Sequence, residues 1–214
     1  MLGKSVAHAT ALWLLVGTNA LYASDAQRMV VDGSAIVFKG DVAPEFGEDG
    51  LADDYQHLLD LAAANPEVTK IVLTGSFPAT RFAVEVARGI ESLGLATEIV
   101  GECTDGCVYM FVAGKQRTLG KDGRLGLRRM TIKASQLREQ FEYDQAYYGW
   151  QDEFGQAAMV YDLGQSSMYW ALQYLIARRV SLDFALRIFA TPREDMWWPE
   201  REEMVVGGVL SAGD

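Results

Sequence analysis

Residues that could carry out chemistry are concentrated in one short turn. The segment Gly-Glu-Cys-Thr-Asp-Gly-Cys, residues 101–107, contains two carboxylates and both cysteines of the chain. Asp105 stands just before an apolar segment, where a short acidic side chain can accept the first backbone N–H groups of a helix. A second interpretation makes Asp105 a general acid or base with Glu102 as its partner. The sequence leaves both interpretations open, with the helix cap preferred.

The two cysteines allow three outcomes. Cys103 and Cys107 can form a disulfide across the turn, stay reduced as small core residues, or ligate a metal. A metal site needs further ligands, and the whole chain has only two histidines, so we expect no metal and no cofactor. In an exported protein the disulfide is favoured, because oxidising compartments preserve such bonds.

Histidine is too scarce for ordinary hydrolase chemistry. His8 lies in the N-terminal segment and His57 in an expected helix, where Asp53 and Asp60 are close in sequence. We expect His57 to be exposed and structural rather than catalytic. A Ser–Lys pair would avoid the need for histidine, but Lys115, Lys121 and Lys133 all fall in polar stretches.

The N-terminus has the layout of a secretory signal peptide. Lys4 and His8 precede an apolar run from Ala9 to Gly17, and small residues follow at Ala20 and Ala23. We expect residues 1–23 to be removed and 24–214 to form one domain in the periplasm or outside the cell. The alternative is an uncleaved membrane anchor, although the apolar run is short for a span of roughly 20 residues.

Composition narrows the class of protein further. The chain has 214 residues, a net charge of −10 and half of its residues hydrophobic, which suits a folded domain with a sizeable core. The negative charge, with no basic run, argues against binding to nucleic acid. A small-molecule cofactor is not expected either.

Strands and helices alternate in the first half of the chain. Short apolar strands separated by helices predict a parallel sheet covered by helices, an α/β fold. Strands are expected at 29–42 with a turn at 32–34, and at 70–74, 97–100 and 124–127; helices are expected at 51–64, from about 80 to Gly94, and at 107–113. Turns are expected at 75–78 and 101–106.

The second half is predicted to be mainly helical. Residues 134–179 read as helix with interruptions near Gly149, Gly155 and Gly164, and a last helix is expected at 181–189. Aromatic residues cluster at Tyr147, Tyr148 and Trp150 and again at Trp197 and Trp198. Core packing or a lid over the cleft is the preferred interpretation of these rings, with a binding groove or subunit contact as the alternative.

The order of these segments resembles exported proteins related to the Clp protease proteolytic subunit, in the Clp/crotonase-like superfamily. The resemblance rests on KIVLTGSFPATRFAVEVARGIESLGLATEIVGECTDGCVYMFVAG, on RLGLRR, and on ATPREDMWWPEREEMVVGGVL near the end. It implies a Ser, a His and an acid, with an oxyanion hole at a Gly-Gly turn. It also implies an α/β fold with a helical C-terminal half.

The positions that match that catalytic layout are chemically altered in this chain. Asp105 stands at the nucleophile position, Arg128 at the histidine position and Ala190 near the acid position. Pro78 and Ala79 replace the Gly-Gly pair, so proline removes one N–H donor. A guanidinium cannot act as a base, but Arg128 can pair with Asp105.

Three functions follow as hypotheses. The preferred one is an exported, non-catalytic Clp-like protein that binds a peptide or protein partner and can form a homo-oligomer. The alternatives are an active exported hydrolase, or a crotonase-like enzyme that uses Asp105 and Glu102 on a thioester.

Overall fold

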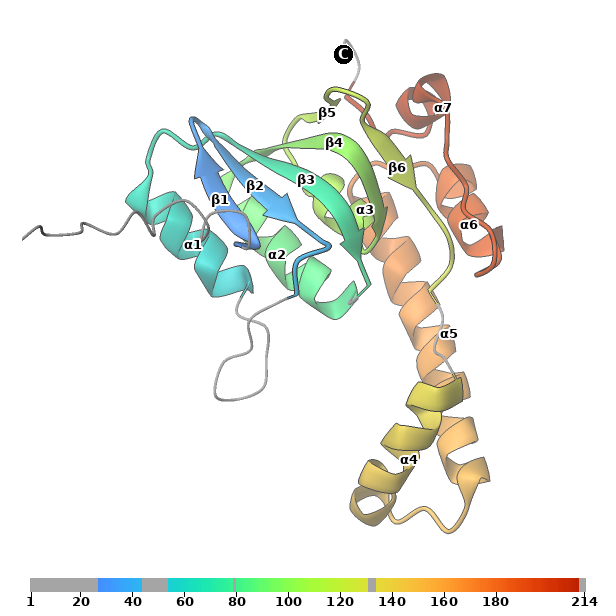
Figure 1. The fold of residues 1–214 in the computed structure, drawn as a ribbon. Coiled ribbons are helices and arrows are strands. Elements are labelled where there is room, and N and C mark those ends of the chain that lie inside the picture. The colour runs from blue at the N-terminus through green and yellow to red at the C-terminus, as the bar shows by residue number, and fades with distance from the viewer. Residues whose placement is uncertain (1–26, 44–53, 79, 131–133, 212–214) are drawn as a thin grey trace, which may run out of the picture.

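The computed structural model describes residues 27–43, 54–78, 80–130 and 134–211. The predicted signal peptide, 1–23, lies outside these residues, as do Ala79 and Lys133. Within them a single sheet is covered by helices, and the C-terminal half of the chain is almost entirely helical (Figure 1). The predicted α/β class is therefore confirmed.

Six strands form the sheet, and most of them are parallel. In chain order they are β1 (Met29–Asp32), β2 (Ala35–Lys39), β3 (Lys70–Phe77), β4 (Ala96–Asp105), β5 (Arg117–Leu119) and β6 (Arg124–Gly126). The spatial order is β1-β2-β3-β4, and β5 and β6 both pair with β4. Among the strands of the described residues, β1 and β2 alone pair antiparallel, because the short turn at Gly33 joins them directly.

Three helices cover one face of the sheet. They are α1 (Asp54–Ala64), α2 (Thr80–Leu93) and α3 (Cys107–Phe111), which lie together behind the strands in Figure 1. Alternate strand residues point into this layer: Ile71 and Leu73 of β3 and Ile99 of β4 are fully buried. Ala87 and Ile90 of α2 meet them, so the periodic apolar stripe predicted for this helix forms the core.

The two central strands run further than the sequence predicts. β3 continues to Phe77 and β4 to Asp105, so the turns predicted at 75–78 and 101–106 are wrong as separate elements. The pairing Leu73–Ile99 is followed by Gly75–Cys103, which means that β4 advances four residues while β3 advances two. This bulge accommodates the glycines that suggested a turn, and Gly101 adopts a φ of 66° within it.

Four helices make up the C-terminal half. They are α4 (Ala134–Tyr148), α5 (Glu153–Ala177), α6 (Leu182–Ala190) and α7 (Arg201–Val206). The predicted break at Gly149 is confirmed, since this residue has a φ of 69° between α4 and α5. The breaks predicted at Gly155 and Gly164 are wrong, because both residues lie inside α5, where a glycine is tolerated at a modest cost.

The aromatic residues divide between two environments. Trp197 packs on Phe184 with ring centroids 4.6 Å apart and contacts the core, as the core-packing interpretation predicts. Tyr147 and Tyr148 do not pack into the core; they lie exposed on the α4–α5 hairpin. None of the described helices is both long and apolar enough to cross a membrane.

Candidate functional site

A polar pocket lies where the parallel strands end. β2, β3 and β4 run in the same direction, so their carboxyl ends meet at one edge of the sheet, the usual ligand-binding edge in open α/β folds. The pocket has a volume of about 250 Å³ and is lined by Asp41, Thr74, Gly75, Ser76, Glu102 and Thr104. Its lining offers carboxylates and hydroxyls, which accept hydrogen bonds from a ligand.

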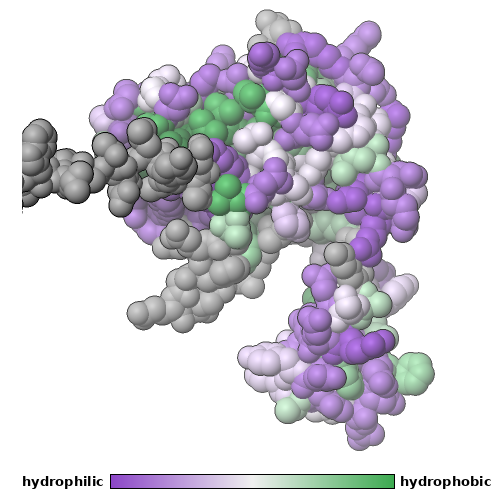
Figure 2. Space-filling model, in the orientation of Figure 1, coloured by the Kyte–Doolittle hydropathy of each residue, from purple (hydrophilic) through white to green (hydrophobic). Residues whose placement is uncertain are grey.

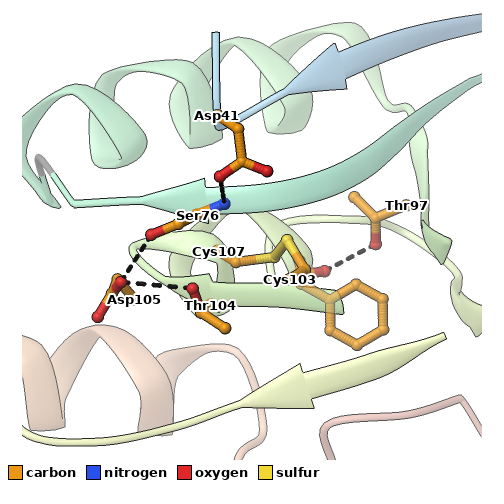
Figure 3. The surroundings of a disulfide bond; sticks show 8 residues. Asp41, Ser76, Thr97, Cys103, Thr104, Asp105 and Cys107 are labelled. Atoms are coloured by element: carbon orange, nitrogen blue, oxygen red, sulfur yellow. Dashed lines mark hydrogen bonds between the residues drawn. A yellow bond between two sulfur atoms is a disulfide. The ribbon is translucent and has the colours of Figure 1, made fainter. Parts of the chain in front are cut away.

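Asp105 ends β4 beside this pocket, and its carboxylate is held by three neighbours. The Ser76 hydroxyl donates to Oδ2 at 2.8 Å, and the Thr104 hydroxyl donates to the same oxygen at 3.3 Å (Figure 3). Arg128 Nε donates to Oδ1 at 3.0 Å. The predicted pairing of Asp105 with Arg128 is therefore confirmed, and both carboxylate oxygens are engaged within the chain.

Asp105 is not the cap of the following helix. The N-cap of α3 is Gly106, no side chain accepts from the first N–H groups there, and the preferred prediction for Asp105 is wrong. Asp105 has a φ of 58°, a left-handed conformation that aspartate tolerates better than most residues. With this backbone conformation, the carboxylate contacts Ser76 and Arg128 and does not cap the N-terminus of α3.

The predicted disulfide fastens this turn. Cys103 on β4 and Cys107 on α3 are bonded to each other, and both residues are fully buried. Asp105 lies midway between them in the sequence, and Figure 3 shows its carboxylate to one side of the disulfide, close to Ser76 and Thr104. The bond therefore ties the end of the strand to the start of the helix on either side of the left-handed residue.

Among the described residues, two backbone positions that could contribute to an oxyanion hole offer no free N–H. In hydrolases the N–H after the nucleophile often supplies one donor. Here the corresponding Gly106 N–H donates to the Phe77 carbonyl at 2.8 Å. A side chain at Gly106 would collide with that carbonyl, since an added Cβ would lie 2.7 Å from the oxygen. Pro78 has no N–H to donate, while Ala79 lies outside the described residues.

Arg128 joins Asp105 to the segment that follows α6. Its second contact is a hydrogen bond from the guanidinium to the Arg193 carbonyl at 3.1 Å, and the neighbouring Arg129 N–H donates to the Thr191 carbonyl. Ala190, at the predicted acid position, is the last residue of α6 and is exposed. The segment thus reaches Arg128 through the Arg193 carbonyl rather than through a carboxylate.

Glu102 lines the pocket but has another partner than Asp105. Its carboxylate pairs with Arg124 Nη2 at 3.4 Å, across the β4–β6 pairing in which these two residues are opposite each other. Its side chain is 61% exposed, whereas that of Asp105 is 20% exposed. These contacts therefore do not form the direct Glu102–Asp105 acid–base pair that was one interpretation of the sequence.

The remaining basic candidates lie at the surface. His57 is exposed on α1, as predicted, and Lys115 and Lys121 are exposed beyond α3 and β5. Among the described residues, histidine, cysteine and acidic side chains form no cluster of three suited to a metal ion.

Burial raises the pKa of Tyr109, on α3, to about 12, and also raises the pKa of Tyr174, whose hydroxyl donates to the Tyr109 carbonyl. These phenols stay neutral at physiological pH.

Sequence reasoning did not single out Ser76 or Asp41. Asp41 accepts the Ser76 N–H at 3.0 Å and lies against Gly75, where an added Cβ would be 2.5 Å from the Asp41 carboxylate. Gly75 also has a φ of 88°, a conformation that favours glycine. The glycine in Thr-Gly-Ser was the only local signal, because residues 41 and 105 come together only through the parallel pairing of the strands.

Comparison with known proteins gives matches at the level of structure alone. No family model matches the chain, and no curated protein matches it significantly. Similar solved structures include a monofunctional enoyl-CoA isomerase from M. smegmatis, with 16% identity, a TM-score of 0.46, and coverage of 86% of this chain and 75% of that chain.

Two further structures are similar to the same degree. One is a putative enoyl-CoA hydratase from Streptomyces coelicolor A3(2), with 13% identity, a TM-score of 0.45, and coverage of 94% of this chain and 71% of that chain. The other is ThnE from S. clavuligerus, with 13% identity, a TM-score of 0.43, and coverage of 85% and 73%.

Proposed function

We propose that this protein is an exported, non-catalytic binding protein that holds a peptide or protein partner in the strand-end pocket. The observation that carries the proposal is the Asp105–Arg128 pair. A catalytic nucleophile needs a free lone pair and a neighbouring base that accepts its proton. Here the carboxylate of Asp105 is instead bound to a permanent cation and two hydroxyls.

The chemistry of the pocket supports a ligand that donates hydrogen bonds. Asp41 and Glu102 contribute negative charge, and Thr74, Ser76 and Thr104 contribute hydroxyls. An amine, a guanidinium or peptide N–H groups would find acceptors there. The volume of about 250 Å³ suits one side chain or a chain terminus better than a large cofactor.

Export is part of the proposal and rests on two observations. The N-terminal 23 residues have the signal-peptide layout, and the chain carries a buried disulfide, a bond that persists in oxidising compartments. Intact-mass analysis of a periplasmic or secreted fraction should show loss of residues 1–23. Full-length protein recovered only from the cytosol would contradict the proposal.

Catalysis is tested with an activity panel. The parent protein and the Asp105→Asn and Glu102→Gln variants are treated with a fluorophosphonate probe, which labels active serines. They are also assayed for turnover of peptides, esters and acyl thioesters. We expect no labelling and no turnover above background in any of them. Turnover by the parent that is lost in either folded variant would support the second candidate, a thioester-directed enzyme, which is favoured by the exposure of Glu102 in the pocket.

Binding is tested with a displayed peptide library. Peptides that bind the parent are expected to contain Lys, Arg or a free amino terminus and to be lost from the Glu102→Gln variant. The matched control is Glu67→Gln, which removes the same charge from an exposed residue that does not line the pocket. Equal loss in both variants would mean that general acidity, rather than the pocket, attracts the peptides.

The role of Arg128 is tested by a double-mutant cycle on stability. Arg128→Met and Asp105→Asn, alone and combined, should give a coupling free energy of about 1–2 kcal/mol, because a charge-assisted hydrogen bond is partly screened at this exposure. Chemical denaturation measures it. A coupling near zero would show that the pair does not hold the turn together.

A further inference from the structure

The α4–α5 hairpin leaves the body of the protein and is largely exposed. Figure 1 shows it projecting away from the sheet, and Figure 2 shows it standing clear of the main mass of side chains. No residue of α4 is buried, and every residue from 161 to 170 is exposed. Only the end of α5 is anchored, where Ala171, Tyr174 and Leu175 pack against the core.

Contacts inside the hairpin hold its tip but do not build a core. Trp150 stacks on Phe141 and Tyr148 with ring centroids 6.0 and 4.9 Å away. The Gln156 amide donates to the Leu137 carbonyl at 2.7 Å. The hydrogen bond joins α5 to α4, and the stacked rings join the connecting loop to α4. They leave most of the apolar side chains of the hairpin in water.

The exposed rings fall at helical spacing. On α4, Tyr143 and Tyr147 are four residues apart, and they are 85% and 83% exposed. On α5, Phe154 and Tyr161 are seven residues apart, and they are 81% and 73% exposed. Exposed aromatic rings on one face of each helix are typical of an interaction surface, because aromatic residues are enriched there.

The charge of the same segment identifies the kind of partner. Residues 134–170 carry six acidic side chains, Glu139, Glu142, Asp144, Asp152, Glu153 and Asp162, and one basic one, Arg138. Half of the net charge of −10 therefore lies in this segment. Such a surface repels an anionic membrane and opposes face-to-face pairing with its own copy. Cationic side chains, by contrast, can lie over the rings and pair with the carboxylates.

We infer that the α4–α5 hairpin is a docking surface for a protein segment rich in arginine or lysine interspersed with apolar residues. The guanidinium or ammonium groups lie over the tyrosine rings, and the acidic side chains surround them. The surface is separate from the strand-end pocket, so this inference does not depend on the proposed function of that pocket.

The test measures binding of a labelled synthetic peptide of alternating Arg and Leu to the full chain by fluorescence anisotropy. Peptides with Glu or Gln in place of Arg serve as controls on the ligand. We expect saturable binding of the Arg peptide alone, weakened by salt, because exposed charges are screened within about 8–10 Å at physiological ionic strength.

Variants separate the hairpin from general acidity. Tyr143→Ser combined with Tyr147→Ser and Tyr161→Ser should weaken binding about tenfold or more, since three exposed cation–π contacts are lost. The matching Tyr→Phe variant keeps the rings and should bind like the parent. Removing three exposed acids of the body, with Glu67→Gln, Glu194→Gln and Asp195→Asn, should also change little. Far-UV circular dichroism checks that helicity is kept.

Three results would overturn the inference. Equal weakening by the body variant would assign binding to net charge. Concentration-dependent self-association that the tyrosine variant abolishes, measured by sedimentation, would assign the surface to a second copy of the chain. Tyrosine-dependent binding to zwitterionic lipid vesicles would assign it to a membrane.

Discussion

The strand-end turn and the α4–α5 hairpin differ in whether their side chains find partners within the chain. At the turn, the carboxylate of Asp105 is saturated by internal partners, the backbone donor of Gly106 is used, and both cysteines are bonded. On the hairpin, rings such as Tyr143 and Phe154 stay exposed. The difference is that the polar groups of the turn are satisfied within the chain, whereas the rings of the hairpin are left in contact with water.

The largest expected effect is a difference in the free energy of unfolding between a variant in the core of the body and a variant on the hairpin. Leu73→Ala removes a fully buried side chain from the central strand β3 and should lower the free energy of unfolding by about 2–5 kcal/mol. Tyr161→Ala on the hairpin should change it by no more than about 0.5 kcal/mol. Denaturant titration of both variants measures this. A comparable loss for Tyr161→Ala would mean that the hairpin is part of the folding core.

The second effect is the loss of stability expected when the Cys103–Cys107 disulfide is removed from the strand-end turn. The Cys103→Ala/Cys107→Ala variant should lose about 2 kcal/mol of stability, near the low end for disulfides because the closed loop is short. Parent protein treated with a reductant should move in the same direction, while the variant should not respond. If reduction leaves the denaturation midpoint of the parent unchanged, the disulfide does not stabilise the turn.

The smallest effect belongs to an exposed contact on the body, at the start of α7. A hydrogen bond from the Glu200 N–H, followed by the Arg187 contact, lowers the pKa of Glu203. Since the folded pKa is lowered, the stabilisation is present above the ordinary carboxyl pKa and is lost as pH falls through the lowered value.

Glu203→Gln is therefore expected to be less stable than the parent at neutral pH, and the gap should close in acid. Chemical denaturation at the two pH values measures it, with Glu202→Gln as the matched neighbour. A gap that is independent of pH would show that the carboxylate charge makes no contribution to the cap.

Much of the body could be predicted from the sequence. Apolar periodicity located α2 and the buried start of α3, and short apolar runs located β3 and β4. The spacing of Cys103 and Cys107, together with the export signal, predicted their bond. The strand ends could not be placed, because a bulged strand and a glycine-rich turn have the same local composition.

The sequence by itself determined which chemistry is scarce in this protein. The count of two histidines is a fact of composition, and it disfavours a serine hydrolase without any coordinates. The resemblance to Clp-like proteins adds that an aspartate and an arginine stand at the expected nucleophile and base positions. The exposure of His57 followed from the polar side of a periodic helix.

Only the tertiary structure decided what those residues contact. Ser76 and Asp105 are far apart in the chain and meet because β3 and β4 pair in parallel. Arg128 reaches Asp105 from beyond β6 rather than from a neighbouring turn. Likewise, helix periodicity is the same for a buried and a solvent-facing stripe, so the exposure of the hairpin rings depends on which elements pack beside them.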